Sequence, residues 1–183
     1  MVSVIWPVTS GSGFRMSITV TTPAHRSTGA GGARRADAPL IRATQHAVFC
    51  VGAIGPTGRK WTSLSKRTRA ELVPVFAEQA AVLIDAGVDA IALETFSYLA
   101  ELEAALEAVR SQSDVVVIAM AAFTGAGVTS DGAGPGEVAR AAESLGADVV
   151  GANCAEGPME LYAIAEELVQ RPLPVAILPN AGY

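Results

Sequence analysis

Apolar residues follow two alternating patterns from His46 to the end of the chain. Short continuous runs of small and β-branched apolar residues are separated by longer segments in which apolar residues recur every three or four positions. Continuous runs are typical of buried strands, and the recurring pattern is typical of helices with one apolar face. The runs predict five strands, at 48–54, 88–93, 114–123, 147–153 and 174–178.

The longer segments predict four helices, at 72–83, 99–109, 135–145 and 158–168. Gly87 and Gly146 follow the first and third of them, where a left-handed glycine ends a helix without steric cost. Pro74 is expected in the first turn of the first helix, because the N–H that proline lacks has no partner there. The acids of the second helix are expected on its outer, solvent-facing side.

The alternation of strands with helices indicates right-handed βαβ units, and hence an α/β fold with a parallel sheet covered by helices. Periodicity alone does not distinguish an open, doubly wound sheet from a barrel. The sequence contains neither a Gly-x-Gly-x-x-Gly motif after a strand nor a Gly-x-x-x-x-Gly-Lys-Ser/Thr loop. Because such motifs support nucleotide-binding sheets, their absence favours a barrel.

Residues 1–45 differ in kind from the rest and predict a separate, poorly ordered segment before a folded domain at 46–183. This segment is rich in Ser, Thr, Gly, Ala and Arg and lacks sustained periodicity. Residues 1–43 hold five arginines and one acid, a net charge of +4 that leaves −9 for the remainder. Three explanations remain open: a flexible tail, a start assigned upstream of the natural one or in the wrong frame, and a transit peptide.

Charge and composition exclude two classes of partner. The acidic remainder lacks the clustered Lys and Arg of a nucleic-acid surface. No apolar stretch approaches the roughly 20 residues of a membrane span. The two cysteines, Cys50 and Cys154, form no pattern typical of a small disulfide-linked domain, which favours a reducing compartment and predicts a cytoplasmic protein.

Polar residues follow two of the predicted strands at matching positions. Segments 86–91 and 145–150 share one pattern, a glycine that ends a helix followed directly by a strand. Aligned on this repeat, the residues after the strands match in pairs, Glu94 with Asn153 and Thr95 with Cys154. The carboxyl ends of parallel strands are where α/β folds bind ligands and perform chemistry.

Each of these residues also has a purely structural interpretation. Cys154 at a strand end is rigidly held near solvent, which suits a metal ligand or nucleophile, yet a cysteine taken alone is more often a small buried apolar residue. Glu94 is either a ligand-binding carboxylate or a solvated loop acid. Asn153 either supports the site or caps the following turn.

Five segments together carry a family resemblance. They are GAIGPTG at 52–58, QAAVLIDAGVDAIALETF at 79–96, GADVVGANC at 146–154, GP at 157–158 and PNAG at 179–182. In this order they resemble the homocysteine-binding domain of the homocysteine S-methyltransferases, a family that includes cobalamin-dependent methionine synthase and betaine-homocysteine methyltransferase. The resemblance covers roughly residues 46–183.

The resemblance implies a (β/α)8 barrel with a zinc ion held by three cysteines. Cys154 matches the first zinc ligand, and the family's other two are adjacent cysteines near the last strand, beyond Tyr183. Cys50 is disfavoured as a second ligand because it lies inside a strand run. Glu94 matches the acid that contacts the amino group of homocysteine, and Asn153 is expected beside it as a second substrate-binding residue. The implied reaction transfers a methyl group from a donor to homocysteine and gives methionine.

The chain also departs from the family. Its five strands correspond to the third to seventh, and the first, second and eighth are not recognisable, so we expect a partial barrel of about five βα units in a truncated chain. A complete barrel typically needs about 250 residues. Open sheet edges would invite self-association.

Two other functions remain open at this point. One is an inactive, truncated barrel that binds a partner. The other is a different barrel enzyme acting on phosphate-bearing substrates, which would depend on the glycines at 125, 127, 132 and 134. The remaining polar and glycine motifs are assigned mainly to turns: Gly55, Pro56, Gly58 and Asp131-Gly132, with Asn180 divided equally between turn and site, and with no role for His25 or His46.

Overall fold

The computed structural model describes residues 49–60, 66–154 and 157–180. Strands and helices alternate throughout these residues, as the sequence predicts. The elements are β1 (Val51–Ile54), α2 (Lys66–Asp85), β2 (Ala90–Phe96), α3 (Leu99–Arg110), β3 (Val116–Ala121), α4 (Pro135–Ser144), β4 (Val149–Asn153), α5 (Pro158–Leu168) and β5 (Val175–Leu178). The predicted segment 1–45 lies outside the described residues.

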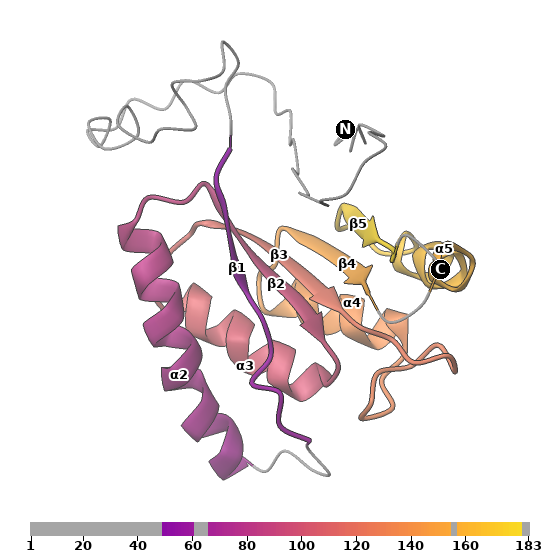
Figure 1. The fold of residues 1–183 in the computed structure, drawn as a ribbon, viewed down its shortest axis with the longest axis horizontal. Coiled ribbons are helices and arrows are strands. Elements are labelled where there is room, and N and C mark those ends of the chain that lie inside the picture. Colours follow the sequence, from indigo (N-terminus) through magenta and orange to yellow (C-terminus); the bar gives the residue numbers. More distant parts are fainter. Residues whose placement is uncertain (1–48, 61–65, 155–156, 181–183) are drawn as a thin grey trace.

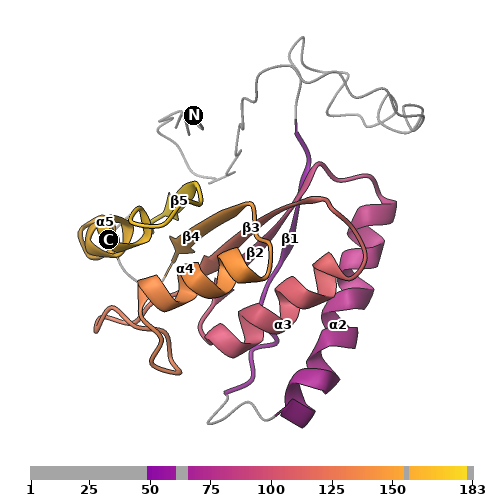
Figure 2. The ribbon, with the colours of Figure 1, turned by 180° about the vertical axis from the view of Figure 1, so that it is seen from behind.

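The five strands form one parallel sheet in the order β1-β2-β3-β4-β5. A doubly wound sheet reverses its strand order at one point and so has helices on both faces. Here the order never reverses, and right-handed crossovers therefore place every helix on the same face. Helices α3 and α4 lie behind the sheet in Figure 1 and in front of it in Figure 2, flanked by α2 and α5. The fold is part of a (β/α)8 barrel, as predicted.

The sheet separates two apolar layers, because successive side chains of a strand point to opposite faces. The larger layer lies between the sheet and the helices and includes Leu93, Val117 and Val150 from the strands. The smaller layer lies on the face without helices and is built by Ala92, Ile118, Met120 and Leu178. In a closed barrel this second face lines the interior.

Two local predictions are wrong. Helix α2 begins at Lys66, so Pro74 lies inside the helix and not in its first turn. The apolar period starts only at Leu72, and the polar residues before it hid the first turns. Glu101, expected on the outer side of α3, is only 1% exposed. The two helix-ending glycines are confirmed, since Gly87 and Gly146 have φ values of 79° and 81°.

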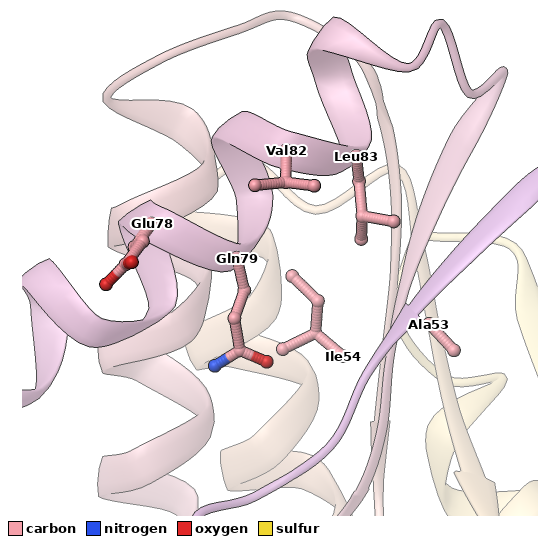
Figure 3. A pocket seen from close by; sticks show the side chains of 6 residues that line it. All are labelled: Ala53, Ile54, Glu78, Gln79, Val82 and Leu83. Atoms are coloured by element: carbon pink, nitrogen blue, oxygen red, sulfur yellow. The ribbon is translucent and has the colours of Figure 1, made fainter.

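Within the described residues, β1 and β5 have a neighbouring strand on one side only. A pocket of about 330 Å³ lies between β1 and α2 at one of these margins. Figure 3 shows Ile54, Val82 and Leu83 gathered around it. None of the predicted site residues lines this pocket. No described helix combines the length and the apolar character needed to cross a membrane.

Candidate active site

The predicted site residues lie together at the carboxyl ends of β2 and β4. These two strands are separated by β3, and Phe96 and Ala152 both pair with the same β3 residue, Ala121. The strand ends are therefore level. The hydroxyl oxygen of Thr95 lies 3.8 Å from the sulfur of Cys154. The internal repeat matched Thr95 with Cys154, and the structure brings these two residues into contact.

A bulge shapes the end of β2. Leu93 pairs with Ala119 and Phe96 pairs with Ala121, so Glu94 and Thr95 together stand opposite the single residue Met120. Bulges of this kind interrupt the ladder and redirect side chains. Thr95 has a φ of 66°, in the left-handed region that a β-branched residue rarely adopts. The backbone N–H of Thr95 donates to Oδ1 of Asn153 at 2.8 Å.

Asn153 links the two strand ends across β3. It is 3% exposed, and its Oδ1 accepts the hydrogen bond from the Thr95 N–H. Its Nδ2 donates to the Thr95 hydroxyl at 2.7 Å and to the Cys154 sulfur at 3.3 Å. Both polar atoms of the amide are therefore engaged by the two neighbouring site residues. This geometry supports a bracing function, and a direct contact between Asn153 and a substrate stays a prediction.

Cys154 is half-buried and has a φ of 57°. Its N–H donates to the carbonyl of Leu178 at 3.1 Å, which ties the residue to the end of β5. A non-glycine residue in this region costs about 1–3 kcal/mol, and it persists only where its surroundings hold it. Thr95 and Cys154 are the two such residues in the described chain, and they are in contact. Strain of this type concentrates at functional sites.

Close packing between β4 and β5 explains why the Gly-Ala-Asn-Cys motif has a glycine at position 151. A Cβ added to Gly151 would overlap the carbonyl oxygen of Ala176 and lie 3.1 Å from Cγ of Met120. Any side chain at this position would therefore push β4 away from β5. Gly151 allows the close approach that places Cys154 against the end of β5.

Glu94 lies on the face that lines the interior of a barrel. Leu93 and Phe96 pack toward the helices, and the two bulge residues between them stand opposite Met120, which belongs to the apolar layer on the other face. Glu94 is half-buried, and within the described residues no hydrogen bond or ion pair engages its carboxylate. An acid beside the Thr95–Cys154 contact with its oxygens uncommitted is suited to accept hydrogen bonds from a cationic group. Its role in substrate binding stays a prediction.

The described residues supply one sulfur ligand for a metal. No group of three or more His, Cys, Asp or Glu side chains within 49–60, 66–154 and 157–180 is arranged to hold an ion. Cys50 precedes β1 at the opposite edge of the sheet, where its N–H donates to Asp89. This position is in keeping with the prediction that disfavours Cys50 as a second ligand. Since a structural or catalytic zinc site uses at least three protein ligands, Cys154 alone does not complete one.

The glycine-rich loop between β3 and α4 does not favour phosphate binding. The N–H groups of Thr124, Gly127, Thr129 and Gly132 all donate to carbonyls within the loop. A phosphate cradle needs such N–H groups to point at the ligand. Asp131 and Gly132 form the predicted turn, with a φ of 91° at Gly132.

Sequence reasoning missed Glu101 and left Thr95 without a role. The only signal for Thr95 was its match to Cys154 in the internal repeat. Glu101 gave no signal, because its partner, Thr57, lies 44 positions away in the chain. Asn180, which the sequence divided between turn and site, is exposed at the end of the described residues.

Comparison with known proteins identifies relatives of this chain. The family model described as homocysteine S-methyltransferase matches residues 16–183. This match begins upstream of the five segments that carry the resemblance. Methionine synthase of Mycobacterium tuberculosis is 32% identical over 140 residues, which cover 73% of this chain and 12% of that protein. Methionine synthase of Mycobacterium leprae is 30% identical over 143 residues, which cover 75% and 12%.

Solved structures agree on the fold. The apo form of the homocysteine methyltransferase MmuM from Escherichia coli superposes with a TM-score of 0.68 at 21% identity, covering 82% of this chain and 57% of that chain. Its metallated form gives 0.62 at 23% identity, covering 82% and 55%. The chain thus spans about one eighth of the length of the methionine synthases and little more than half of MmuM. From the match over 16–183, the chain belongs to the homocysteine S-methyltransferase family.

Proposed function

We propose that this chain carries the homocysteine-facing part of an enzyme that transfers a methyl group to the thiol of homocysteine and gives methionine. The observation that carries the proposal is the linked pair of strand ends, where Asn153 holds Thr95 and Cys154 in contact beside Glu94. Family membership supplies the substrate class. The geometry supports it because a carboxylate and a thiol face the same edge of the sheet.

In this proposal Glu94 binds the ammonium group of homocysteine. The carboxylate lies on the interior face, half-buried and without a partner among the described residues. A charge-assisted hydrogen bond in such a place is stronger than one in open water. Asn153 holds the neighbouring residues in place, because both ends of its amide are bonded to them.

Cys154 is proposed as one of three thiolate ligands of a zinc ion. When bound, zinc would keep the thiol of the substrate deprotonated at neutral pH. The described residues provide this one thiolate, so the remaining ligands would have to come from outside them. We therefore propose that the active unit is larger than the described arc, and that the chain works as part of a barrel completed by other segments.

A non-catalytic function is the second candidate, and the single sulfur ligand favours it. A partial barrel that has lost its metal would still present the apolar margins of α2 and α5 to a partner. The two candidates differ in whether the chain binds homocysteine and retains zinc. The cytoplasmic location stays a prediction.

The test is calorimetric titration of the full chain with L-homocysteine, before and after incubation with zinc, together with metal analysis of the purified protein. We expect homocysteine binding that Glu94→Gln weakens by about 10-fold or more, the loss of one hydrogen bond to a charged group. Asp114→Asn, an exposed acid at the other edge of the sheet, is the matched control. A chain that binds neither homocysteine nor zinc would rule out the methyl-transfer proposal.

A further inference from the structure

The loop that follows β1 is tied to helix α3 by a pair of short hydrogen bonds. The N–H and the hydroxyl of Thr57 both donate to Oε1 of Glu101, at 2.9 and 2.6 Å. Thr57 and its neighbours Gly55 and Gly58 are exposed, so little other packing fixes this loop. The two bonds to Glu101 therefore attach this loop to the first turn of α3.

Glu101 is in an unusual position for an acid. It lies in the first turn of α3 and is only 1% exposed, whereas Glu107 on the same helix is exposed. Burial of a carboxylate is costly unless hydrogen bonds replace its water. Thr57 supplies two of them. Helix α3 does not itself need a buried acid in its first turn. We therefore attribute the burial of Glu101 to its hydrogen bonds with Thr57.

The same end of α3 also holds the loop that follows β3. Oδ1 and Oδ2 of Asp131 accept hydrogen bonds from the N–H groups of Leu99 and Ala100, at 3.0 and 3.3 Å. Tyr98, at the N-cap position, provides no side-chain cap. Asp131, which is distant in sequence, caps the helix in its place. The first turn of α3 is thus the common anchor of two loops.

These loops flank the candidate site. Ile54 pairs with Leu93, so the loop that begins at Gly55 lies level with Glu94 on the next strand. Figure 1 shows the end of β1 and the start of α3 at the same end of the sheet, the lower end in that view. A ligand held by Glu94 would therefore meet the loop that carries Thr57.

We propose that Glu101 is a positioning residue of the homocysteine site, which holds the 55–60 loop in its ligand-binding conformation through Thr57. The inference rests on the proposed function for the identity of the ligand. Glu101 itself does not touch the ligand. It acts by keeping the loop ordered before the ligand arrives, which lowers the cost of binding.

The test combines hydrogen exchange of the loop amides with homocysteine titration of the zinc-incubated full chain. Glu101→Leu removes the oxygen that accepts both hydrogen bonds from Thr57, and Glu101→Gln keeps an oxygen that Thr57 can reach. We expect Glu101→Leu to remove protection of the Thr57 amide and to weaken homocysteine binding by about 10-fold, the loss of hydrogen bonds to a charged group. Glu101→Gln should restore both to within about 3-fold.

Two further variants keep the test decisive. Glu103→Leu is the matched control on the same helix, because Glu103 pairs with Arg69 and not with the loop. It should leave loop protection and homocysteine affinity unchanged. If Glu101→Leu does not fold, Thr57→Val replaces it in the test, because Thr57 is the exposed partner of Glu101. We expect Thr57→Val to weaken homocysteine binding by about 3-fold.

The outcomes separate this inference from the function on which it rests. Loss of loop protection with unchanged homocysteine affinity would show that Glu101 is merely structural and would overturn the inference alone. Unchanged loop protection in Glu101→Leu would overturn it as well. A wild-type chain that does not bind homocysteine, while the loop still responds to Glu101, would overturn the proposed function and the ligand assigned to the loop.

Discussion

The helices at the two margins of the sheet differ from the two between them in what they expose. The exposed large apolar residues of the helices are Val75 and Val82 on α2 and Met159 and Tyr162 on α5. Helices α3 and α4 contribute none. The reason is geometric, because α3 and α4 pack against a helix on each side and the marginal helices against one. The apolar surface of α2 and α5 is therefore of the kind that a neighbouring element covers in a closed barrel.

The candidate site belongs to the centre of this arrangement. It is built on β2 and β4, which both have a neighbouring strand on each side. Thr95 and Cys154 adopt left-handed backbone conformations that cost free energy and need rigid surroundings. The central strands provide those surroundings. The site therefore depends on the well-packed centre of the sheet, and changes at the margins should affect it less.

The centre and the margin are expected to differ most in how much the truncation of one apolar side chain lowers the free energy of unfolding. Leu106 on α3 is 1% exposed and Val82 on α2 is 66% exposed. Leu106→Ala should lower the free energy of unfolding by about 2–5 kcal/mol, because it leaves a cavity. Val82→Ala should change it by less than about 0.5 kcal/mol. Urea denaturation measures both, and equal effects would contradict the contrast between centre and margin.

Gly151→Ala tests the close approach of β4 and β5. The added Cβ would meet the backbone of Ala176, which cannot move as a flexible side chain can. We expect a loss of about 1–3 kcal/mol in the free energy of unfolding, as for other overpacked sites. Gly55→Ala is the matched control, since nothing lies within 4 Å of its added Cβ. A Gly151→Ala protein as stable as the control would refute the packing explanation of the motif.

Cys154→Gly should increase stability while removing the proposed zinc ligand. A glycine adopts a φ of 57° without the steric cost that cysteine bears. We expect a gain of about 1 kcal/mol in the free energy of unfolding. Cys154→Ala also lacks the thiol but keeps the strain, and it should show no such gain. If glycine and alanine gave equal stability, the strain at this strand end would not be real.

The smallest effect on stability is expected for the marginal helices, where association is the relevant measurement. Met159→Lys and Tyr162→Lys place charges on the exposed face of α5 and should change the free energy of unfolding by less than about 0.5 kcal/mol. If the margins mediate self-association, as the sequence predicts, sedimentation velocity should show less oligomer in the double variant. Arg140→Ala, on the exposed surface of α4, is the control. Equal oligomer content in all three proteins would refute association through α5.

Some features of the site were accessible from local sequence. The repeat of a helix-ending glycine followed by a strand indicated that polar residues follow β2 and β4 at the same edge of the parallel sheet. The bulge that lets Thr95 reach Asn153 was not accessible. It arises from the pairing of β2 with β3, which no local pattern of β2 records. The burial of Glu101 was hidden for the same reason, because its partner is distant in sequence.

Local sequence patterns were enough to establish the order and type of the elements, the glycines that end helices at 87 and 146, and the family. These depend on residues within one or two turns of each other. Only the tertiary structure decided that the sheet is singly wound, that Pro74 sits inside a helix, and that Asn153 joins two strands across a third. Those outcomes depend on which distant segments meet, and that choice is made by packing over the whole domain.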